Sequence, residues 1–387
     1  MLKKFIREIL KSAVVSTLFG FPFRADTSQT LRSFFTSQLQ FYTAITTLSY
    51  ISAKAQGDTT NRNLGIKRAV TNPIAPRNIV YGKTRVGGTI VQRTVSGANQ
   101  TNDVLHQVIA IAGHEINDIT KVYIDGGKGT KELSLTSDFA SATEDSATVF
   151  RCTSADFSNT DNDNAYTGGS LIKLTFEKGD QTAANGYAVA QMSSASAWST
   201  NHKMLGIAYV YINCIFDTEK FTQIPTFSFE VEGKKVFDPV TSTTTFSTNP
   251  ALIIRDYLMD STYGFGATTT EINDATTGAG FVKARSDCND SVSITSGTES
   301  RFTLNGVFTS TEEPQTVLET MLSSCAGQLL YNNGVFSLFV GKERTASGTI
   351  TDDKILEPIQ IQTKFSGREL ANGVKATYVR PTDEYIA

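Results

Sequence analysis

Apolar positions near the start of the chain recur at the spacing of a helix. Within residues 1–24 they follow an i, i+3, i+4 order, at Leu2, Phe5, Ile6, Ile9, Ala13 and Val14. This order predicts an amphipathic helix with a basic face. A second stripe over Thr27–Ala55 predicts another helix, capped by Asp26 or Thr27. The polar tract Gln56–Pro76 contains Gly and Pro and predicts a linker.

Two roles remain open for the first helix. Its regular stripe, with Arg7, Glu8 and Lys11 inside the apolar run, favours docking on its own protein or on a partner helix. A basic start followed by apolar residues is also typical of a secretory signal or of a helix on a membrane surface. The chain has no stretch of about 18 uninterrupted apolar residues, so we expect no membrane-spanning helix.

After Pro76 the apolar pattern becomes that of strands. Short runs between Gly-containing turns predict strands at Ile79–Tyr81, Thr89–Val95, Val104–Ala112 and Ile119–Ile124. The long apolar run Leu205–Phe216 predicts a central strand. The runs Phe227–Val231 and Lys235–Phe237 predict a hairpin around Gly233.

The intervening residues 134–201 have a different composition. They are rich in Ser, Thr, Ala, Asn and Asp, and one clear strand pattern stands at Leu171–Glu177. A long polar stretch between strands predicts a weakly packed insertion, either a subdomain or a large loop.

Helical signals return in the C-terminal half. Pro250 stands where a first helical turn accepts proline, and apolar residues recur behind it. A second helix is predicted over Thr270–Cys288. Ser310 and Glu313 have the spacing of a capping box before a third helix, Pro314–Cys325.

Strand and turn signals separate and follow these helices. Ser286–Ser300 is polar and predicts a loop, and Arg301–Val307 predicts a strand. The tripeptide Asn332–Gly334 between two apolar runs predicts a hairpin turn. The segment Ile361–Tyr378 predicts more strand.

These elements predict an α+β protein that is predominantly β, with several β-rich domains, an N-terminal helical arm and a few short helices in the C-terminal half. The predicted division is a helical arm and linker over 1–75, a β-rich domain over 76–125 and 201–245, an inserted subdomain or loop over 126–200, an α+β domain over 246–345, and a C-terminal β segment over 346–387.

Composition narrows the class of protein. The chain has 387 residues, which suggests two or three domains, and 40% of them are hydrophobic, which argues against disorder of the whole chain. Only 19% are charged and the formal net charge is −3, whereas proteins that bind duplex nucleic acid are usually strongly basic.

Cysteine and histidine give little support to a metal site. The cysteines Cys152, Cys214, Cys288 and Cys325 lie far apart without a CxxC pair, which excludes a zinc ribbon or a thioredoxin-type dithiol. We interpret Cys214 and Cys325 as small buried hydrophobic residues, and disulfides stay open. His106, His114 and His202 are too few for a histidine-rich centre. On one strand, the first two would stand about 26 Å apart, which predicts structural histidines.

Two motif fragments fail on spacing. Gly82-Lys83-Thr84 resembles the end of a phosphate-binding loop, but Arg77 occupies the position of the required first glycine and a strand pattern follows instead of a helix. We therefore predict a tight turn there, with Gly87 and Gly88 at positive φ. His114-Glu115 begins like HExxH, but Asp118 stands where the second histidine should be.

Acidic pairs and aromatic clusters remain ambiguous. A glycosidase needs two carboxylates about 5–9 Å apart, so Glu312-Glu313 and Asp352-Asp353 leave an enzyme open. The first pair also fits a helix N-terminus. Aromatic residues near two glycines, at Tyr257, Tyr263 and Phe265, fit a core better than a carbohydrate platform. We assign no catalytic, cofactor-binding or metal-binding residue and expect no cofactor.

An ordered set of these segments resembles one protein family. The segments are Ile79–Gly88, Val104–Glu115, Ile119–Asp125, Leu205–Tyr211, Gly233–Pro239, Asn249–Gly264, Asn305–Val307, Val317–Gly327 with the residues from Gly334 on, and Asn372–Tyr378. In order and spacing they are similar to blocks of siphophage tail tip, or central tail hub, proteins. That family is related to the N-terminal hub part of the lambda-like host-specificity protein J and to gene-transfer-agent hubs. The ordered set covers roughly residues 70–380, and 126–200 has no counterpart.

The resemblance implies a structural protein of a bacteriophage virion and not an enzyme. Such hubs form a homotrimer at the distal end of the tail, beneath the distal tail ring protein. They close the tail tube, contact the tape-measure protein, carry a central fibre or receptor-binding protein for host attachment, and open for DNA passage. Relatives are often longer, so fibre functions are expected on other proteins or beyond Ala387. In this setting the N-terminal helix contacts the tape measure, the ring or, transiently, the host membrane.

The composition is compatible with that role. Many apolar strands with few charges suit broad contacts between subunits, which in a threefold ring are head-to-tail. A near-neutral bore would let DNA slide, since dense Lys and Arg would hold phosphates. Two other classes stay open, a tail-associated cell-wall-degrading enzyme and a surface adhesin or carbohydrate-binding module.

Overall fold

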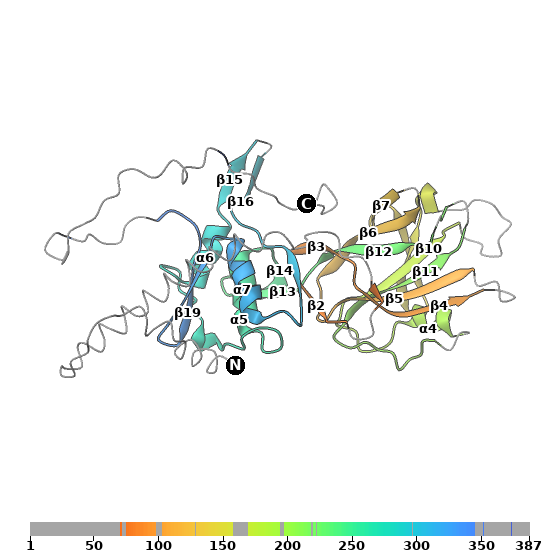
Figure 1. The fold of residues 1–387 in the computed structure, drawn as a ribbon, viewed down its shortest axis with the longest axis horizontal. Coiled ribbons are helices and arrows are strands. Elements are labelled where there is room, and N and C mark those ends of the chain that lie inside the picture. Colours follow the sequence, from red (N-terminus) through yellow and green to blue (C-terminus); the bar gives the residue numbers. More distant parts are fainter. Residues whose placement is uncertain are drawn as a thin grey trace.

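The protein is described in a computed structural model that covers residues 70–71, 75–97, 103–157, 169–344, 351 and 373, apart from positions 128, 194–196, 218–219, 222 and 296. The helices predicted over 1–24 and 27–55, most of the linker, and the strand predicted over Ile361–Tyr378 lie outside these residues. The described chain is elongated, with a β-rich half at one end and a half that combines helices and strands at the other (Figure 1).

A seven-stranded sheet forms the first layer. Its order is β1 (Val70–Thr71), β4 (Thr89–Ser96), β5 (Val104–Ala112), β11 (Ala208–Ile215), β10 (Ile172–Glu177), β9 (Ala147–Cys152) and β8 (Phe139–Glu144). Every pair is antiparallel except β1 with β4. All eight residues of β11 are buried because strands flank it on both sides and side chains cover both faces. The predicted central strand is therefore confirmed.

A four-stranded sheet packs against this layer. Its order is β3 (Lys83–Val86), β12 (Thr226–Glu232), β6 (Asp118–Gly127) and β7 (Gly129–Ser134). Ile109 and Val210 of the larger sheet share one buried cluster with Val122 and Phe229 of the smaller sheet. Such face-to-face burial of alternate side chains makes this half a β-sandwich.

The helix α4 (Gly186–Met192) covers the outer face of the larger sheet. Asn185 caps it, because the side-chain Oδ1 accepts a hydrogen bond from the Ala188 N–H at 3.0 Å. Tyr187 and Trp198 pack against Tyr211 and neighbouring residues of the sheet in a separate buried cluster. This layer buries aromatic side chains on a face that would otherwise meet solvent.

The residues predicted as a weakly packed insertion are mostly regular structure. Strands β7 to β10, a short 3₁₀ helix (Ala155–Phe157) and α4 all fall within residues 126–200. β10 pairs with β11 and β9 with β10, so this stretch extends the main sheet, and a large loop is the wrong description of these residues. The strand predicted at Leu171–Glu177 is confirmed as β10.

The second half is built around α5 (Pro250–Met259). The helices α6 (Phe281–Cys288) and α7 (Pro314–Ser323) pack on it, together with β13 (Lys235–Asp238). The remaining elements are β14 (Thr243–Phe246), a 3₁₀ helix (Thr269–Glu271), β15 (Ser291–Ile294), β16 (Gly297–Ser300), β18 (Gln328–Asn332) and β19 (Val335–Phe339). Eight of the ten residues of α5 are buried, so α5 is the centre of the second core.

Several predictions for this half are wrong in detail. β12 and β13 do not pair with each other, because β12 pairs with β3 and β6 whereas β13 pairs with β14. The helix predicted over Thr270–Cys288 begins only at Phe281, after Gly278 has taken a φ of 63°. The loop predicted over Ser286–Ser300 is the β15–β16 hairpin. The strand predicted over Arg301–Val307 begins at Gly306, as β17 (Gly306–Thr309).

The start of α7 also differs from its prediction. Glu313 is the N-terminal cap without a side-chain hydrogen bond, so the capping box with Ser310 is absent. Ser310 Oγ instead accepts a hydrogen bond from the Arg77 N–H at 3.1 Å. The hairpin turn between β18 and β19 is confirmed, with Asn333 and Gly334 both at positive φ, 51° and 84°. Taken over the described residues, the α+β, predominantly β fold class is confirmed; the domain boundaries stay a prediction.

Candidate functional site

One bent strand connects the two cores. β2 (Asn78–Tyr81) pairs with β17 in the second half, and β3 directly after it pairs with β12 in the sandwich. Gly82 makes the bend at a φ of 63°, and a Cβ there would lie 2.2 Å from the Leu304 carbonyl oxygen. Val80 packs in the sandwich core whereas Ile79 and Tyr81 pack in the second core, so alternation along β2 joins the halves. In Figure 1, β2 and β3 lie between the two halves.

A partly buried charge cluster lies beside this strand. Lys234 Nζ lies 2.7 Å from Asp256 Oδ2 and 2.7 Å from Asp260 Oδ2. The Tyr81 hydroxyl donates a hydrogen bond to Asp256 Oδ2 at 2.5 Å. Burial, followed by the neighbouring carboxylate of Asp256, raises the pKa of Tyr81 well above its usual value. The Tyr81 hydroxyl therefore stays protonated, and the four groups form one network of ion pairs and hydrogen bonds that links the chain after β12 to α5.

Lys234 and Asp260 stabilise each other's charged forms. Burial alone would lower the pKa of Lys234, but its bonds to the two carboxylates outweigh burial and raise it. For Asp260, burial acts upward, yet the hydrogen bonds from Lys234 and from the Tyr263 and Thr262 N–H groups leave its pKa lowered. Both groups are thus charged at neutral pH.

His114 occupies the same junction as a structural residue. Its Nε2 accepts a hydrogen bond from the Val80 N–H at 2.9 Å, and its Nδ1 lies 2.7 Å from the Glu115 carbonyl oxygen. Burial lowers the pKa of His114, so the ring is neutral with the proton on Nδ1. The prediction of a structural histidine is confirmed, and both ring nitrogens are engaged.

Further hydrogen bonds cross the junction. The Lys83 N–H donates to Asn305 Oδ1 at 2.8 Å, and the Tyr263 hydroxyl donates to the Gly113 carbonyl oxygen at 3.3 Å. An ion pair joins Lys235 and Glu115. Residues from five of the resembling sequence segments meet here, namely Ile79–Gly88, Val104–Glu115, Gly233–Pro239, Asn249–Gly264 and Asn305–Val307. Sequence reasoning singled out Gly82 and His114 for other chemistry and missed that they share this place.

A second histidine, His106, links Ser96 and Tyr211 by hydrogen bonds within the sandwich. His106 Nε2 lies 2.7 Å from Ser96 Oγ, and His106 Nδ1 lies 2.7 Å from the Tyr211 hydroxyl. A serine hydroxyl beside an oriented histidine is the arrangement of an activated nucleophile. However, burial lowers the pKa of His106 to about 4, which makes it a weak general base at neutral pH. These hydrogen bonds are better explained as the pairing of buried polar groups, which agrees with the prediction of a structural role for His106.

The other candidate residues take structural positions. Tyr257 is buried and packs edge-on against Phe265 and Phe308 at ring distances of 6.0 and 5.3 Å, which confirms a core aromatic cluster. Glu312 accepts a hydrogen bond from the Thr309 N–H at 2.9 Å. Asp352-Asp353 lies outside the described residues. All four cysteines are buried free thiols, as predicted for Cys214 and Cys325.

The described residues contain neither a cluster of metal ligands nor a membrane-spanning helix. No group of three or more His, Cys, Asp or Glu side chains there is placed to hold a metal ion. None of the described helices is long and apolar enough to cross a membrane.

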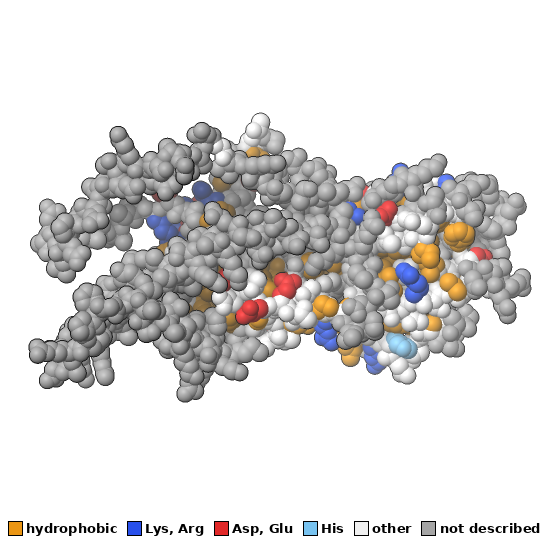
Figure 2. All heavy atoms as spheres, in the orientation of Figure 1, with side chains coloured by type: hydrophobic (Ala, Val, Ile, Leu, Met, Phe, Trp, Pro, Cys, Tyr) orange, Lys and Arg blue, Asp and Glu red, His pale blue; other side chains and the backbone are white. Residues whose placement is uncertain are grey.

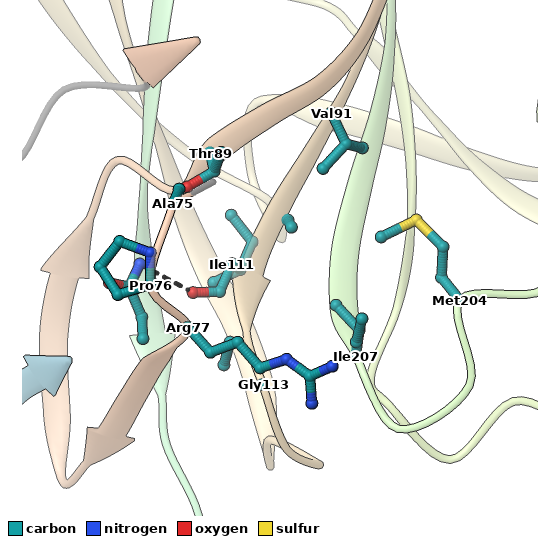
Figure 3. Close-up of a pocket in the computed structure, with 12 residues that line it drawn as sticks. Ala75, Pro76, Arg77, Thr89, Val91, Ile111, Gly113, Met204 and Ile207 are labelled. Carbon is teal, nitrogen blue, oxygen red and sulfur yellow. Dashed lines mark hydrogen bonds between the residues drawn. The ribbon is translucent and has the colours of Figure 1, made fainter. Parts of the chain in front are cut away.

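Two hollows lie in the described surface. One groove of about 190 Å³ lies where β4 begins and β5 ends, and the Arg77 side chain extends along it toward Ile207 and Met204 (Figure 3). A second of about 290 Å³ lies beside α5, next to Phe237 and Arg255. Both volumes fall below the roughly 300 Å³ at which small-molecule pockets begin.

The exposed surface mixes apolar and charged groups. Large exposed apolar side chains are Val91, Val95, Leu205, Phe216, Ile224, Phe237, Val240, Ile294 and Tyr331. On the face shown in Figure 2, apolar side chains gather over the sandwich half with isolated Lys and Arg beside them. Single exposed apolar residues are ordinary, and two of these, Val91 and Val95, lie on one strand, β4.

No protein-family model matches the sequence, and no curated protein matches it. One solved structure similar to this fold is a chain from the virion of a native gene transfer agent particle, with a TM-score of 0.42 and 12% sequence identity. The match covers 73% of this chain and 58% of that chain, so this chain spans little more than half the length of its neighbour.

Proposed function

We propose that this chain is a structural protein of a phage-like virion and forms the trimeric central hub at the distal end of the tail. The observation that carries the proposal is the convergence of five resembling sequence segments on the junction between the two cores. Segments up to 222 positions apart meet there through hydrogen bonds, which explains why their order and spacing together form one signature.

The junction suits a protein that bears load between neighbours. Two cores joined by a strand, a charge network and backbone hydrogen bonds act as one stiff unit, because each contact fixes the orientation of one half relative to the other. A hub that closes a tail tube needs such a unit, since a pliable one would not hold the tube shut.

The proposed role is assembly and not catalysis. The two hollows are too small for a typical substrate pocket, and His106 and His114 are neutral structural residues. Broad contacts would instead bind a second and third copy, the distal tail ring protein, the tape-measure protein and a central fibre or receptor-binding protein. In this proposal DNA passes through the lumen when the hub opens at infection.

Two measurements test the proposal. Light scattering of the purified full chain is expected to give about 126 kDa, three times the 42.0 kDa of one chain. Gold-labelled antibody against the chain is expected to mark the distal tail end of particles, with preimmune serum as the control. Label elsewhere on the particle would overturn the hub.

Two further assays separate the other classes of function. Clearing of purified peptidoglycan in a gel would identify a cell-wall-degrading enzyme. A monomer at all concentrations that is retained on a carbohydrate array would identify an adhesin. We expect neither result from a hub.

A further inference from the structure

His114 takes the place of a main-chain acceptor at the bent strand. One edge of β2 pairs with β17, and the opposite edge is bonded by groups from separate segments. On that edge the Gly113 N–H donates to the Asn78 carbonyl oxygen at 2.9 Å, and the Lys234 N–H donates to the Val80 carbonyl oxygen at 2.8 Å. The Val80 N–H donates to His114 Nε2 at 2.9 Å. A side-chain nitrogen thus completes an edge that main-chain groups bond on either side of it.

The hydrogen bonds of the ring fix its tautomer. Nδ1 of His114 lies 2.7 Å from the Glu115 carbonyl oxygen, and a carbonyl only accepts, so Nδ1 carries the proton. Nε2 is then the acceptor that the Val80 N–H requires. A second proton, on Nε2, turns this acceptor into a donor, and two N–H groups cannot share a hydrogen bond. Protonation of His114 therefore breaks its bond to Val80.

Charged and titratable groups from each neighbouring segment lie around the ring. They are Arg77 before β2, Tyr81 of β2, Glu115 after β5, Asp118 of β6, Lys178 after β10, Lys234 before β13, Lys235 of β13, and Asp256 and Asp260 at the end of α5. Most of them already have partners, because Lys235 is paired with Glu115 and Lys178 with Asp118. A protonated ring adds a second cation to a network that already contains Lys234.

We propose that His114 is an acid-sensitive switch of the junction, and that its protonation releases the Val80 N–H and opens β2 and β3 while both cores stay folded. The released N–H must find water as its partner, so this edge of the strand has to open. Neither of the two large apolar clusters that form the cores includes His114, so their packing does not depend on the proton. The opening is therefore local.

The switch is closed at neutral pH. Burial is the main cause that lowers the pKa of His114, and the charge of Lys234 acts in the same direction, against the Glu115 carbonyl oxygen and the carboxylates of Asp256 and Asp260. Because the native pKa lies below the unfolded value of about 6.5, the stability that this ring contributes is complete above pH 6.5 and is lost as the pH falls. The inference concerns contacts within one chain and does not depend on the proposed hub function.

Amide hydrogen exchange of the full chain tests the proposal. Mass spectrometry follows exchange from about pH 7.5 to about pH 4.5, and an unstructured reference peptide corrects for the pH dependence of the chemical exchange rate. In peptides that cover β2 and β3, we expect protection to fall by about tenfold or more below pH 6.5. Peptides that cover β11 and α5, the centres of the two halves, are expected to keep their protection to within about twofold.

The variant His114→Gln assigns the effect to this ring. The glutamine amide oxygen can accept from the Val80 N–H and does not titrate, so the pH-dependent loss in β2 and β3 should disappear. His106→Gln is the matched control, because His106 is a second histidine with both ring nitrogens bonded but lies in the sandwich. It should leave the response of β2 and β3 as in the wild type. An undiminished loss of protection in His114→Gln would overturn the role of His114.

The wild type alone also decides whether the switch exists. Protection of β2 and β3 that stays within about twofold of its neutral value down to pH 4.5 would overturn it. So would a loss that β11 and α5 share in equal measure, because the proton would then unfold the whole chain and not open the junction. Neither comparison requires a variant to fold.

Discussion

Lys234 Nζ lies 2.7 Å from Asp256 Oδ2, and this ion pair joins the chain that leaves the sandwich to the central helix of the second core. Lys234 N also donates to the Val80 carbonyl oxygen at 2.8 Å, so its backbone is held by the bent strand while its side chain holds α5. Lys234 thus contacts both the strand that connects the two halves and the central helix of the second half.

Removal of this cation should destabilise the fold. In Lys234→Met, the carboxylates of Asp256 and Asp260, each mostly buried, lose their shared partner. We therefore expect the free energy of unfolding to fall by about 2–4 kcal/mol. Lys178→Met is the matched control, because the Lys178–Asp118 pair is exposed and should change stability by about 0.5 kcal/mol or less. Urea unfolding measures both. Equal losses in the two variants would show that the junction network contributes nothing special.

The bend in the connecting strand should require glycine. Gly82→Ala places a Cβ 2.2 Å from the Leu304 carbonyl oxygen at a φ of 63°. We expect the free energy of unfolding to fall by about 3 kcal/mol or more. Gly206 has a similar φ of 71° with open space around its Cβ position, so Gly206→Ala should lose only the backbone strain, about 1 kcal/mol. Thermal unfolding compares the two. A loss in Gly82→Ala no larger than that in Gly206→Ala would refute the close-approach argument.

The sequence predicted the positions of strands better than it predicted which segments contact each other. β5 matches its prediction to the residue, because its apolar residues, interrupted only by His106 and Gln107, stand close together along the chain. β8 was missed because four of its six residues are exposed Ala, Ser and Thr, which have no apolar alternation. Gly233 looked like a hairpin turn, but its N–H bonds to Gly82, a residue 151 positions away, and local patterns hold no information on such a contact.

The candidate site was missed for the same physical reason. The resemblance placed the segments in order, but Lys234 meets Asp256 and Asp260 only because the chain reverses between β13 and α5. A lysine four residues from a carboxylate on one helix can be recognised from spacing, whereas these pairs are 22 and 26 positions apart. Only the fold brings the charges together.

Stability should fall as the pH drops below about 6.5, in part through His106. Its folded pKa of about 4 lies below the unfolded value of about 6.5, so between these values the unfolded state binds more protons. Stability from this group is complete above pH 6.5 and declines toward pH 4, by up to about 3 kcal/mol. Burial lowers the pKa of His114 as well, and that shift acts in the same direction.

The variant His106→Gln separates this contribution from the others. It removes the titrating ring, so the slope of unfolding free energy against pH between 4 and 6.5 should become shallower, whatever the change in absolute stability. Urea unfolding at half-unit pH steps measures both slopes. Parallel slopes for His106→Gln and the wild type would contradict the assignment.

The aromatic cluster around α5 should carry stability and not binding. Tyr257 is 1% exposed and packs against Phe265 and Phe308, so Tyr257→Ala leaves a cavity in the second core and should cost about 3–5 kcal/mol. Tyr331 is 39% exposed and contacts Phe336, so Tyr331→Ala should cost about 1 kcal/mol. Differential scanning calorimetry of both variants measures the contrast, and soluble oligosaccharides should leave the wild-type Tm unchanged. If sugar raised the wild-type Tm and Tyr257→Ala abolished that rise at unchanged stability, the cluster would be a carbohydrate platform and the core assignment would fall.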